Sequence, residues 1–506
     1  MKKFKKILSV AAACGLVGAS ALTFAGCSEQ DEVITLRVCS WEEYIDLGSW
    51  KDDERITLDN GEEIFGENAI YDEFAEWFNG ESDFGFKVKV EYSTFGTNED
   101  LYNRLSLGDV YDLVCPSDYM IMKLLAEDKI QEYSDDFKNG EYATNVSPYI
   151  KGIFTEYGWE KYAACYMWGT TGIVYNPDKI KDDADVSTWN ILLNEDYKRQ
   201  VTIKDNVRDA YFAALGIINS EQLTTQQLDS EHLTDLMNAT DSETIAKAED
   251  VLKRIKDNVY SFETDSGKAD MVTGKVIANY QWSGDAITIL DGADADGTEL
   301  WYSVPDECAN LWFDGWVMLK SGIDGNEKRQ TAAEAFVNYL SRPKNAVRNM
   351  YYIGYTSAIA GDTVFEYLDW TYGAEDDADE NKVLPYDVSY FFGEDGEYII
   401  DANSDDFAID KATGEINRGR QLFAQYPPEN VKSRSVVMRD FEDKLAEINQ
   451  MWINVRCLDV TDISPVTIGV ICGAAGLITI ASLLYAFRYK LFIKYKPKKG
   501  FSKVEE

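Results

Sequence analysis

Four short stretches of the sequence combine carboxylates with large aromatic residues, each at the predicted end of a strand. They are Trp41-Glu-Glu-Tyr44, Pro116-Ser-Asp-Tyr119, Gln281-Trp-Ser-Gly-Asp285 and Trp312-Phe-Asp314. A buried ammonium group needs a carboxylate partner, and an aromatic face attracts the same cation while covering its methylene groups. The stretches together predict a binding site for a cationic, partly apolar molecule, although each one alone is more typical of an ordinary strand end.

The first stretch places its two acids on opposite faces of the strand. Side chains alternate between the two faces of a strand, so Trp41 and Glu43 should share one face while Glu42 and Tyr44 share the other. Only one of the two acids can therefore line a site on a given face.

The elements that must position these residues alternate along the first third of the chain. Strands are predicted at 34–39, 86–92 and 111–115, and helices at 68–78 and 100–107. This rhythm favours a largely parallel sheet with helices on its faces, and such sheets bind ligands at the carboxyl ends of their strands. A second α/β stretch begins near Trp168, so we expect an α/β protein with two or more domains.

Charge and composition exclude several functions. Asp and Glu outnumber Lys and Arg by 89 to 49, which disfavours nucleic acid as a partner and would attract a cationic solute, or simply keep an exposed protein soluble. The single histidine, His232, leaves no triad or His-rich metal site. An enzyme such as a carboxylate-pair glycosidase remains the weakest alternative, because the adjacent Glu42 and Glu43 point to opposite faces.

No metal site or cofactor is predicted. None of the eight cysteines forms a CxxC pair, and Cys39, Cys115 and Cys165 lie in apolar strands as small core residues. Residues 401–412 resemble a calcium loop but lack its glycine and its final glutamate. We interpret the surrounding acidic segment, about 373–420, as a solvated insertion.

Both ends of the chain suggest contact with a membrane. Residues 1–26 have the basic start and apolar run of a lipoprotein signal peptide, which would leave Cys27 lipidated at the head of a tether, 27–33. Residues 463–487 carry no charge and would cross a bilayer as one helix, followed by a basic tail, 488–506, on the cytoplasmic side. We therefore expect the intervening chain on the extracellular face.

The ordered motifs resemble the polyamine (spermidine/putrescine) binding proteins of ABC importers. Besides the four stretches above, the resemblance rests on Tyr111–Cys115, Trp168-Gly-Thr-Thr-Gly172, Ser187-Thr-Trp189 with Tyr197-Lys198, Asp205-Asn-Val-Arg-Asp209 and Ile353-Gly-Tyr355. It extends over about residues 34–370 and more loosely to 456. The resemblance implies capture of putrescine or spermidine and delivery to a permease and ATPase; another cationic amine or an amino acid is the alternative ligand.

The family fold implies two lobes that close on the solute, joined by crossing strands. Lobe 1 would contain 34–167 and 313–364, and lobe 2 would contain 168–312 and 365–456. The residues that the resemblance assigns to the ligand are Trp41, Glu43, Tyr44, Ser117, Tyr119, Asn206, Asp209, Trp282, Asp285, Trp312, Asp314 and Tyr355. Asn206 stands where some members have an aspartate, and Asp285 fits the putrescine-type pattern better than the spermidine-type one.

Overall fold

A computed structural model describes residues 32–80, 84–375, 378–393 and 398–457, and the positions 479, 482 and 485. The chain divides into the units Met1–Asn449 and Gln450–Glu506, and the first contains the sheets described below. Within the described ranges, no helix has the length and apolar character needed to span a bilayer. The predicted signal peptide, Cys27 and, apart from those three positions, the predicted span 463–487 lie outside the described residues.

The main sheet has a parallel part and an antiparallel part. Its principal strands lie in the order β16-β17-β11-β7-β12-β5-β1-β4, and β8, β9 and β10 extend it from β7. The bounds are β1 Val33–Trp41, β4 Lys87–Phe95, β5 Leu113–Val114, β6 Ile130–Gln131, β7 Ala163–Tyr175, β8 Val201–Lys204, β9 Ser261–Glu263, β10 Ala278–Trp282, β11 Trp301–Ser303, β12 Ala309–Leu319, β13 Thr356–Ser357, β16 Phe407–Ile409, β17 Ile416–Gly419 and β18 Ser435–Val436. Two small hairpins, β2 Ile56–Thr57 with β3 Glu63–Ile64 and β14 Val383–Asp387 with β15 Ile399–Asn403, lie apart from it.

The parallel rhythm predicted for the first third of the chain is confirmed. Alternate residues of β1 (Ile34, Leu36 and Val38) are buried, and β1 pairs in parallel with both β4 and β5. Helix α1, Ile70–Gly80, packs against β4, with Phe74 and Phe78 buried on the face that the sequence predicts. Cys39, Cys115 and Cys165 are buried thiols, as expected.

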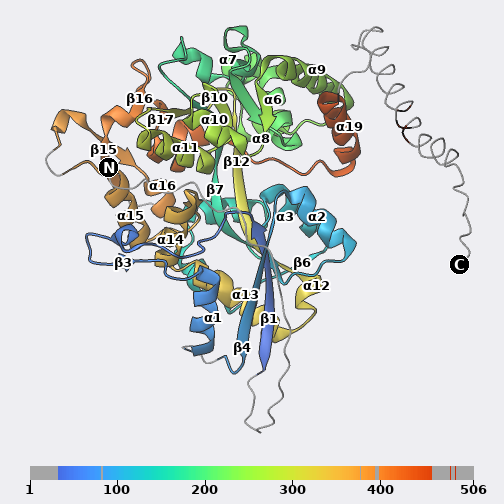
Figure 1. Cartoon of the computed structure of the whole chain (residues 1–506), viewed down its shortest axis with the longest axis vertical. Helices are drawn as coiled ribbons and strands as arrows, with labels where there is room; N and C mark the ends of the chain where they lie inside the picture. The colour runs from blue at the N-terminus through green and yellow to red at the C-terminus, as the bar shows by residue number, and fades with distance from the viewer. Residues whose placement is uncertain are drawn as a thin grey trace, which may run out of the picture. The chain divides into compact units, whose positions relative to one another are not determined.

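Helices pack around the main sheet on both sides of the long strands β7 and β12 (Figure 1). In chain order they are α1, α2 Asn98–Leu107, α3 Asp118–Ala126, α4 Glu141–Asn145, α5 Pro148–Glu156, α6 Val207–Ile218, α7 Ser220–Thr225, α8 Ser230–Met237, α9 Ser242–Asn258, α10 Ser266–Val272, α11 Ser283–Ala295, α12 Lys320–Ile323, α13 Glu327–Leu340, α14 Pro343–Ile353, α15 Asp362–Tyr372, α16 Ser389–Phe392, α17 Gln421–Gln425, α18 Glu429–Lys432 and α19 Leu445–Arg456.

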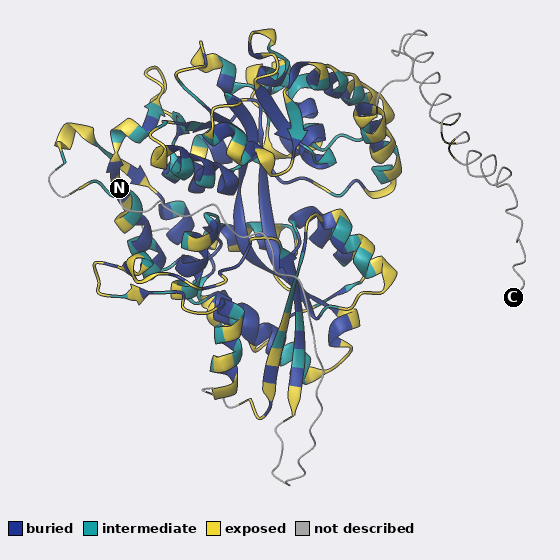
Figure 2. Cartoon of the chain, in the orientation of Figure 1, coloured by how far each residue is buried: buried dark blue, intermediate teal, exposed yellow. Residues whose placement is uncertain are grey.

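Strands β7 and β12 connect the two lobes. They run antiparallel to each other, and every residue of both is buried. One end of β12 pairs with β5 and β6 of the first lobe, whereas residues 171–175 of β7 pair with β10 of the second. Figure 1 shows both strands passing between the two groups, and Figure 2 shows them buried along their length. The predicted two-lobed α/β fold is confirmed, with a mixed sheet.

The segment 373–420 is more than the solvated insertion that its acidic composition predicted. Its aromatic residues Tyr386, Phe391, Phe392 and Phe407 are buried. Strand β17 also pairs with β11, which continues the main sheet. The acidic residues lie mostly on the exposed side of this segment. On its apolar side, helix α16 packs on α5, and the Phe391 ring stacks on Trp168 of β7.

The last helix begins later than expected. The sequence predicts a helix over 439–455, but α19 starts at Leu445, after a short helical turn at Glu442–Lys444. Residues before it are held in an extended path because Arg208 donates to the carbonyl of Arg439, while the Asn238 side chain accepts from the Arg439 backbone N–H.

Candidate ligand-binding site

Asp314 lies where both lobes meet, on the bridging strand β12. The β7–β12 register shifts between Asp314 and Gly315, and Asp314 also forms a bridge with Ser117 at the start of α3. Ser117 Oγ donates to Asp314 Oδ1 over 2.6 Å, and Tyr44 OH donates to Oδ2 over 2.7 Å. Among the described residues, no Lys, Arg or His nitrogen lies within 4.0 Å of this carboxylate.

Asp314 is a buried carboxylate without a positive partner among the described residues. Burial raises the pKa of Asp314 to about 6, although the two hydroxyl donors act in the opposite direction. The carboxylate is therefore ionised at neutral pH and desolvated, with neutral donors as its hydrogen-bond partners. An arriving ammonium group would supply the charge that this site lacks.

Aromatic rings surround this carboxylate. The Tyr355 ring lies 5.1 Å from Tyr44 and 5.8 Å from Trp312 between centroids, both edge-on. Two glycines make room for these rings: a Cβ on Gly284 would lie 2.4 Å from the Tyr355 ring, and one on Gly169 would lie 2.7 Å from Trp312. The glycines of the Trp168 and Gln281 motifs are thus explained by close approach of aromatic side chains.

Asp285 lies on the other side of Tyr355 and has a different environment. Tyr355 OH donates to Asp285 Oδ1 over 2.9 Å. Lys204 Nζ lies 3.6 Å from Oδ2, and Lys268 Nζ lies 3.5 Å from Oδ1. Lys204 Nζ also lies 4.0 Å from the centre of the Trp282 ring. Asp285 is therefore already paired with cations of the protein itself.

Asp209, in the first turn of α6, approaches the same group of residues through Trp282. Trp282 Nε1 donates to Asp209 Oδ1 over 3.4 Å. Burial raises the pKa of Asp209 to about 6, against the attraction of Lys204. We call the connected set Tyr44, Ser117, Asp209, Trp282, Asp285, Trp312, Asp314 and Tyr355 the aromatic–acidic cluster.

The remaining predicted residues lie beside this cluster or serve other contacts. The Trp41 ring packs 4.7 Å from Phe95, and the Asn206 side chain caps α6 by accepting from the Arg208 backbone N–H. Glu43 is exposed in a turn with φ 53°, because β1 ends at Trp41. The strand alternation used to orient Glu43 therefore does not extend to it.

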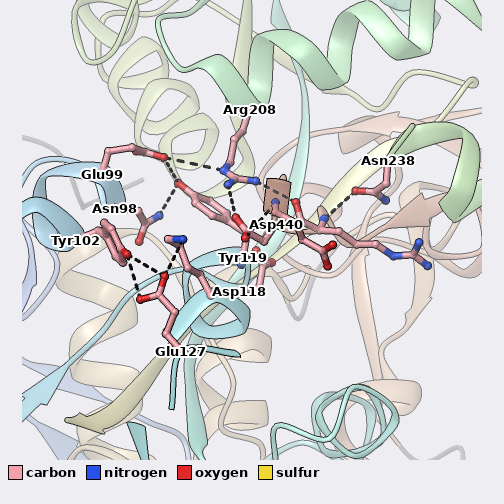
Figure 3. A network of polar contacts seen from close by, with 12 residues as sticks. Asn98, Glu99, Tyr102, Asp118, Tyr119, Glu127, Arg208, Asn238 and Asp440 are labelled. Carbon is pink, nitrogen blue, oxygen red and sulfur yellow. Dashed lines mark hydrogen bonds and ion pairs between the residues drawn. The ribbon is translucent and has the colours of Figure 1, made fainter. Parts of the chain in front are cut away.

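Tyr119 is covered by Arg208 (Figure 3). The guanidinium carbon lies 3.7 Å from the ring centre, and Arg208 Nη2 pairs with Asp440 at 3.0 Å. Tyr119 OH accepts from Asn98 Nδ2 at 2.8 Å and donates to Glu99 at 3.4 Å. Arg208 of α6 thus contacts Glu99 of α2 and Tyr119 of α3, which belong to the other lobe. Its guanidinium lies on a face of the Tyr119 ring, the ring that the resemblance assigned to a ligand.

Sequence reasoning missed the cations of this region and one buried acid. Lys204 ends the otherwise uncharged strand Val201-Thr-Ile-Lys204, which was the available signal. Asp118 Oδ2 accepts from the Phe313 backbone N–H, next to Asp314, and burial raises the pKa of Asp118 to about 8. Asp118 is therefore largely protonated at neutral pH. Its hydrogen bond holds the backbone of Phe313, the residue before Asp314.

Comparisons with known proteins identify the family of the chain. Residues 69–361 match a family described as bacterial extracellular solute-binding protein. The spermidine/putrescine-binding periplasmic protein of Salmonella typhimurium is 27% identical over 361 residues, which are 70% of this chain and 84% of that protein. The putrescine/agmatine-binding protein of Pseudomonas aeruginosa is 26% identical over 277 residues, covering 53% and 71%.

Solved structures show the same fold. PotD, a spermidine/putrescine ABC transporter substrate-binding protein of Streptococcus pneumoniae, aligns with a TM-score of 0.53 at 22% identity, covering 83% of this chain and 98% of PotD. A putative spermidine/putrescine ABC transporter protein of Listeria monocytogenes aligns with a TM-score of 0.55 at 21% identity and similar coverage.

Proposed function

The chain belongs to the bacterial extracellular solute-binding protein family, and we propose that it captures a polyamine in the aromatic–acidic cluster for delivery to an ABC transporter. Asp314 is the observation that carries the proposal. Its carboxylate is buried and ionised at neutral pH, accepts from Tyr44 and Ser117, and has no cation of the described chain beside it. A ligand ammonium group would complete this site, with cation–π attraction from the neighbouring rings.

Binding by such a site follows from charge and closure. Each ammonium pairs with a carboxylate, the methylenes between ammoniums pack on Trp312 and Tyr355, and exclusion of water strengthens the pairs. The residues come from both lobes: Tyr44 and Ser117 precede β7, whereas Asp209, Trp282 and Asp285 follow it. A ligand that contacts both sets stabilises the closed arrangement, which the permease and ATPase would then receive.

The alternative ligand is another cationic amine or an amino acid. An amino acid would place its carboxylate close to Lys204 or Lys268, the cations that flank Asp285. Calorimetry of the full chain in detergent, with putrescine, spermidine, agmatine, lysine and arginine as titrants, separates these ligands. Binding of a diamine or polyamine at least about tenfold tighter than either amino acid is expected; the reverse order would reject the polyamine.

We further propose that lipid on Cys27 and the segment 463–487 hold the protein at the extracellular face of the membrane, with residues 488–506 in the cytoplasm. Attachment near the permease would raise the effective concentration of loaded protein. A variant with Cys27→Ser that also lacks 463–506 should leave the membrane fraction, whereas each single change should leave the protein bound. Release by either single change would limit the anchor to that one element.

A further inference from the structure

Lys204 has the surroundings of a bound ligand ammonium. Its side chain is fully buried at the end of β8, and its Nζ donates to the Thr264 carbonyl over 3.0 Å. The same atom lies 3.6 Å from Asp285 and 3.7 Å from Glu263, with the Trp282 ring 4.0 Å away. Two carboxylates, a carbonyl and an aromatic face are the groups that a polyamine ammonium would require.

The carboxylate of Glu263 beside this lysine is itself held by the protein. Glu263 Oε2 accepts from the Gly267 backbone N–H over 2.7 Å, and Oε1 accepts from Asn279 Nδ2 over 3.1 Å. A Cβ on Gly267 would lie 2.4 Å from Glu263 Oε1, so this approach requires glycine. The ammonium of Lys204 is thus a permanent part of the binding region.

Lys268 takes the other oxygen of Asp285. Its Nζ lies 3.5 Å from Asp285 Oδ1 and 2.9 Å from Asp265 Oδ1, and its side chain remains 28% exposed. Both oxygens of Asp285 are therefore paired within the protein. Asp209 and Asp314 differ, because neither has a Lys, Arg or His nitrogen within 4.0 Å among the described residues.

We propose, on the premise of the proposed function, that Lys204 stands in for one ligand ammonium and makes the site select a diamine over a triamine. Two carboxylates of the cluster remain for two ligand ammoniums, at Asp314 and Asp209. A third ammonium would meet Asp285 already paired with Lys204 and Lys268, and like charges in a desolvated site repel strongly. Lys204 is then a specificity-determining residue that need not touch the ligand.

The test compares putrescine with spermidine by calorimetry on the full chain in detergent. The parent should bind putrescine at least about tenfold more tightly than spermidine. The double variant Lys204→Met with Glu263→Gln removes one buried charge of each sign and frees one oxygen of Asp285. We expect it to shift the affinity ratio toward spermidine by about tenfold or more.

Lys275→Met is the matched control, since Lys275 also pairs with an aspartate (Asp270, 3.0 Å) and faces a ring (Tyr260, 4.7 Å), but is exposed. The putrescine/spermidine affinity ratio of this control should equal that of the parent. The variant Lys268→Gln provides a second arm if the buried double variant does not fold, and should shift the ratio in the same direction.

Two results would overturn the inference and leave the proposed function standing. One is a parent that prefers spermidine, and the other is a putrescine/spermidine ratio that stays the same in every folded lysine variant. A parent that binds neither amine would instead reject the proposed function, and the inference with it.

Discussion

Asp314 and Asp285 are both buried carboxylates that accept a hydrogen bond from a tyrosine of the same aromatic group, yet they differ in charge balance. Asp314 accepts from the hydroxyls of Tyr44 and Ser117, whereas Asp285 has two lysine ammoniums within 3.6 Å. A buried charge needs a partner. At Asp285 the protein supplies it; at Asp314 we propose that the ligand does. The neighbouring charges, rather than the residue type, distinguish the two carboxylates.

Asp314→Asn should cause the largest loss of amine affinity, because it removes the carboxylate that has no positive partner among the described residues. Removing one partner of a buried charge pair costs about 2–5 kcal/mol of binding free energy, roughly a thirtyfold to several-thousandfold loss of amine affinity. The ligand-free variant should unfold at the same or a higher temperature at neutral pH, because an unpaired buried charge has been removed. Calorimetry measures the affinity, and thermal unfolding measures the stability.

Asp270→Asn is the matched control for this substitution, because Asp270 has a surface lysine as its partner in the second lobe. Its amine affinity should not change. If Asp314→Asn also bound the amine like the parent, the ligand site would have to lie elsewhere.

A change of pH tests the same carboxylate without mutation. The pKa of Asp314 and that of Asp209 are raised to about 6 by burial, so lowering the pH through 6 protonates groups that an ammonium needs ionised. Amine affinity should be constant above about pH 7 and fall by about tenfold per pH unit below 6 for each carboxylate that the ligand engages.

Lowering the pH should raise the contribution of these two carboxyl groups to the stability of the ligand-free protein, whereas it lowers the amine affinity. The folded pKa of each group lies above its unfolded value of 3.8. Their contribution to the free energy of unfolding is thus complete below about pH 4 and is lost as the pH rises through 6. The ligand-induced rise in unfolding temperature should therefore be larger at pH 7.5 than at pH 5, and equal rises would contradict this assignment.

Tyr44→Phe sharpens the contrast by removing one hydroxyl donor from Asp314. A hydrogen bond to a charged group contributes about 1.5 kcal/mol or more, which corresponds to about one pH unit. The midpoint of the affinity–pH curve should move from about 6 toward about 7, with about a twofold loss of affinity at neutral pH. Tyr162→Phe, which removes a surface hydroxyl donor to Glu132, should leave the curve unchanged.

The sequence predicted much of the framework and pointed to two carboxylates of the candidate site. The alternation of Ile34, Leu36 and Val38 and the apolar face of α1 predicted the parallel first lobe, because burial imposes these periods. The aromatic–acid strand ends identified Asp314 and Asp285 together. Their difference could not be predicted, since Lys204 and Lys268 reach Asp285 from other elements, β8 and α10, through tertiary packing.

Local irregularities account for the places where the structure departs from the geometry that the sequence predicts. Glu43 lies beyond the end of β1, where strand alternation no longer applies. Arg208 covers the ring of Tyr119 and binds the backbone carbonyl of Arg439, ahead of the last helix. Its contacts join segments up to 232 positions apart. Such pairings are set by tertiary packing and leave no local pattern in the sequence.

Trp282 and Trp312 extend the comparison from the acids to the rings, and Trp282→Phe has the smallest expected effect of all the substitutions. The Trp282 face already meets Lys204 Nζ at 4.0 Å, so a ligand ammonium gains little from it. Trp282→Phe should change amine affinity by less than about twofold, whereas Trp312→Phe should weaken it by about threefold or more through lost cation–π attraction and area. Calorimetry on both variants at pH 7.5 gives the two ratios. A larger loss at Trp282 than at Trp312 would place the ligand ammonium on the Trp282 ring, and Lys204 could then not be the cation that occupies that face.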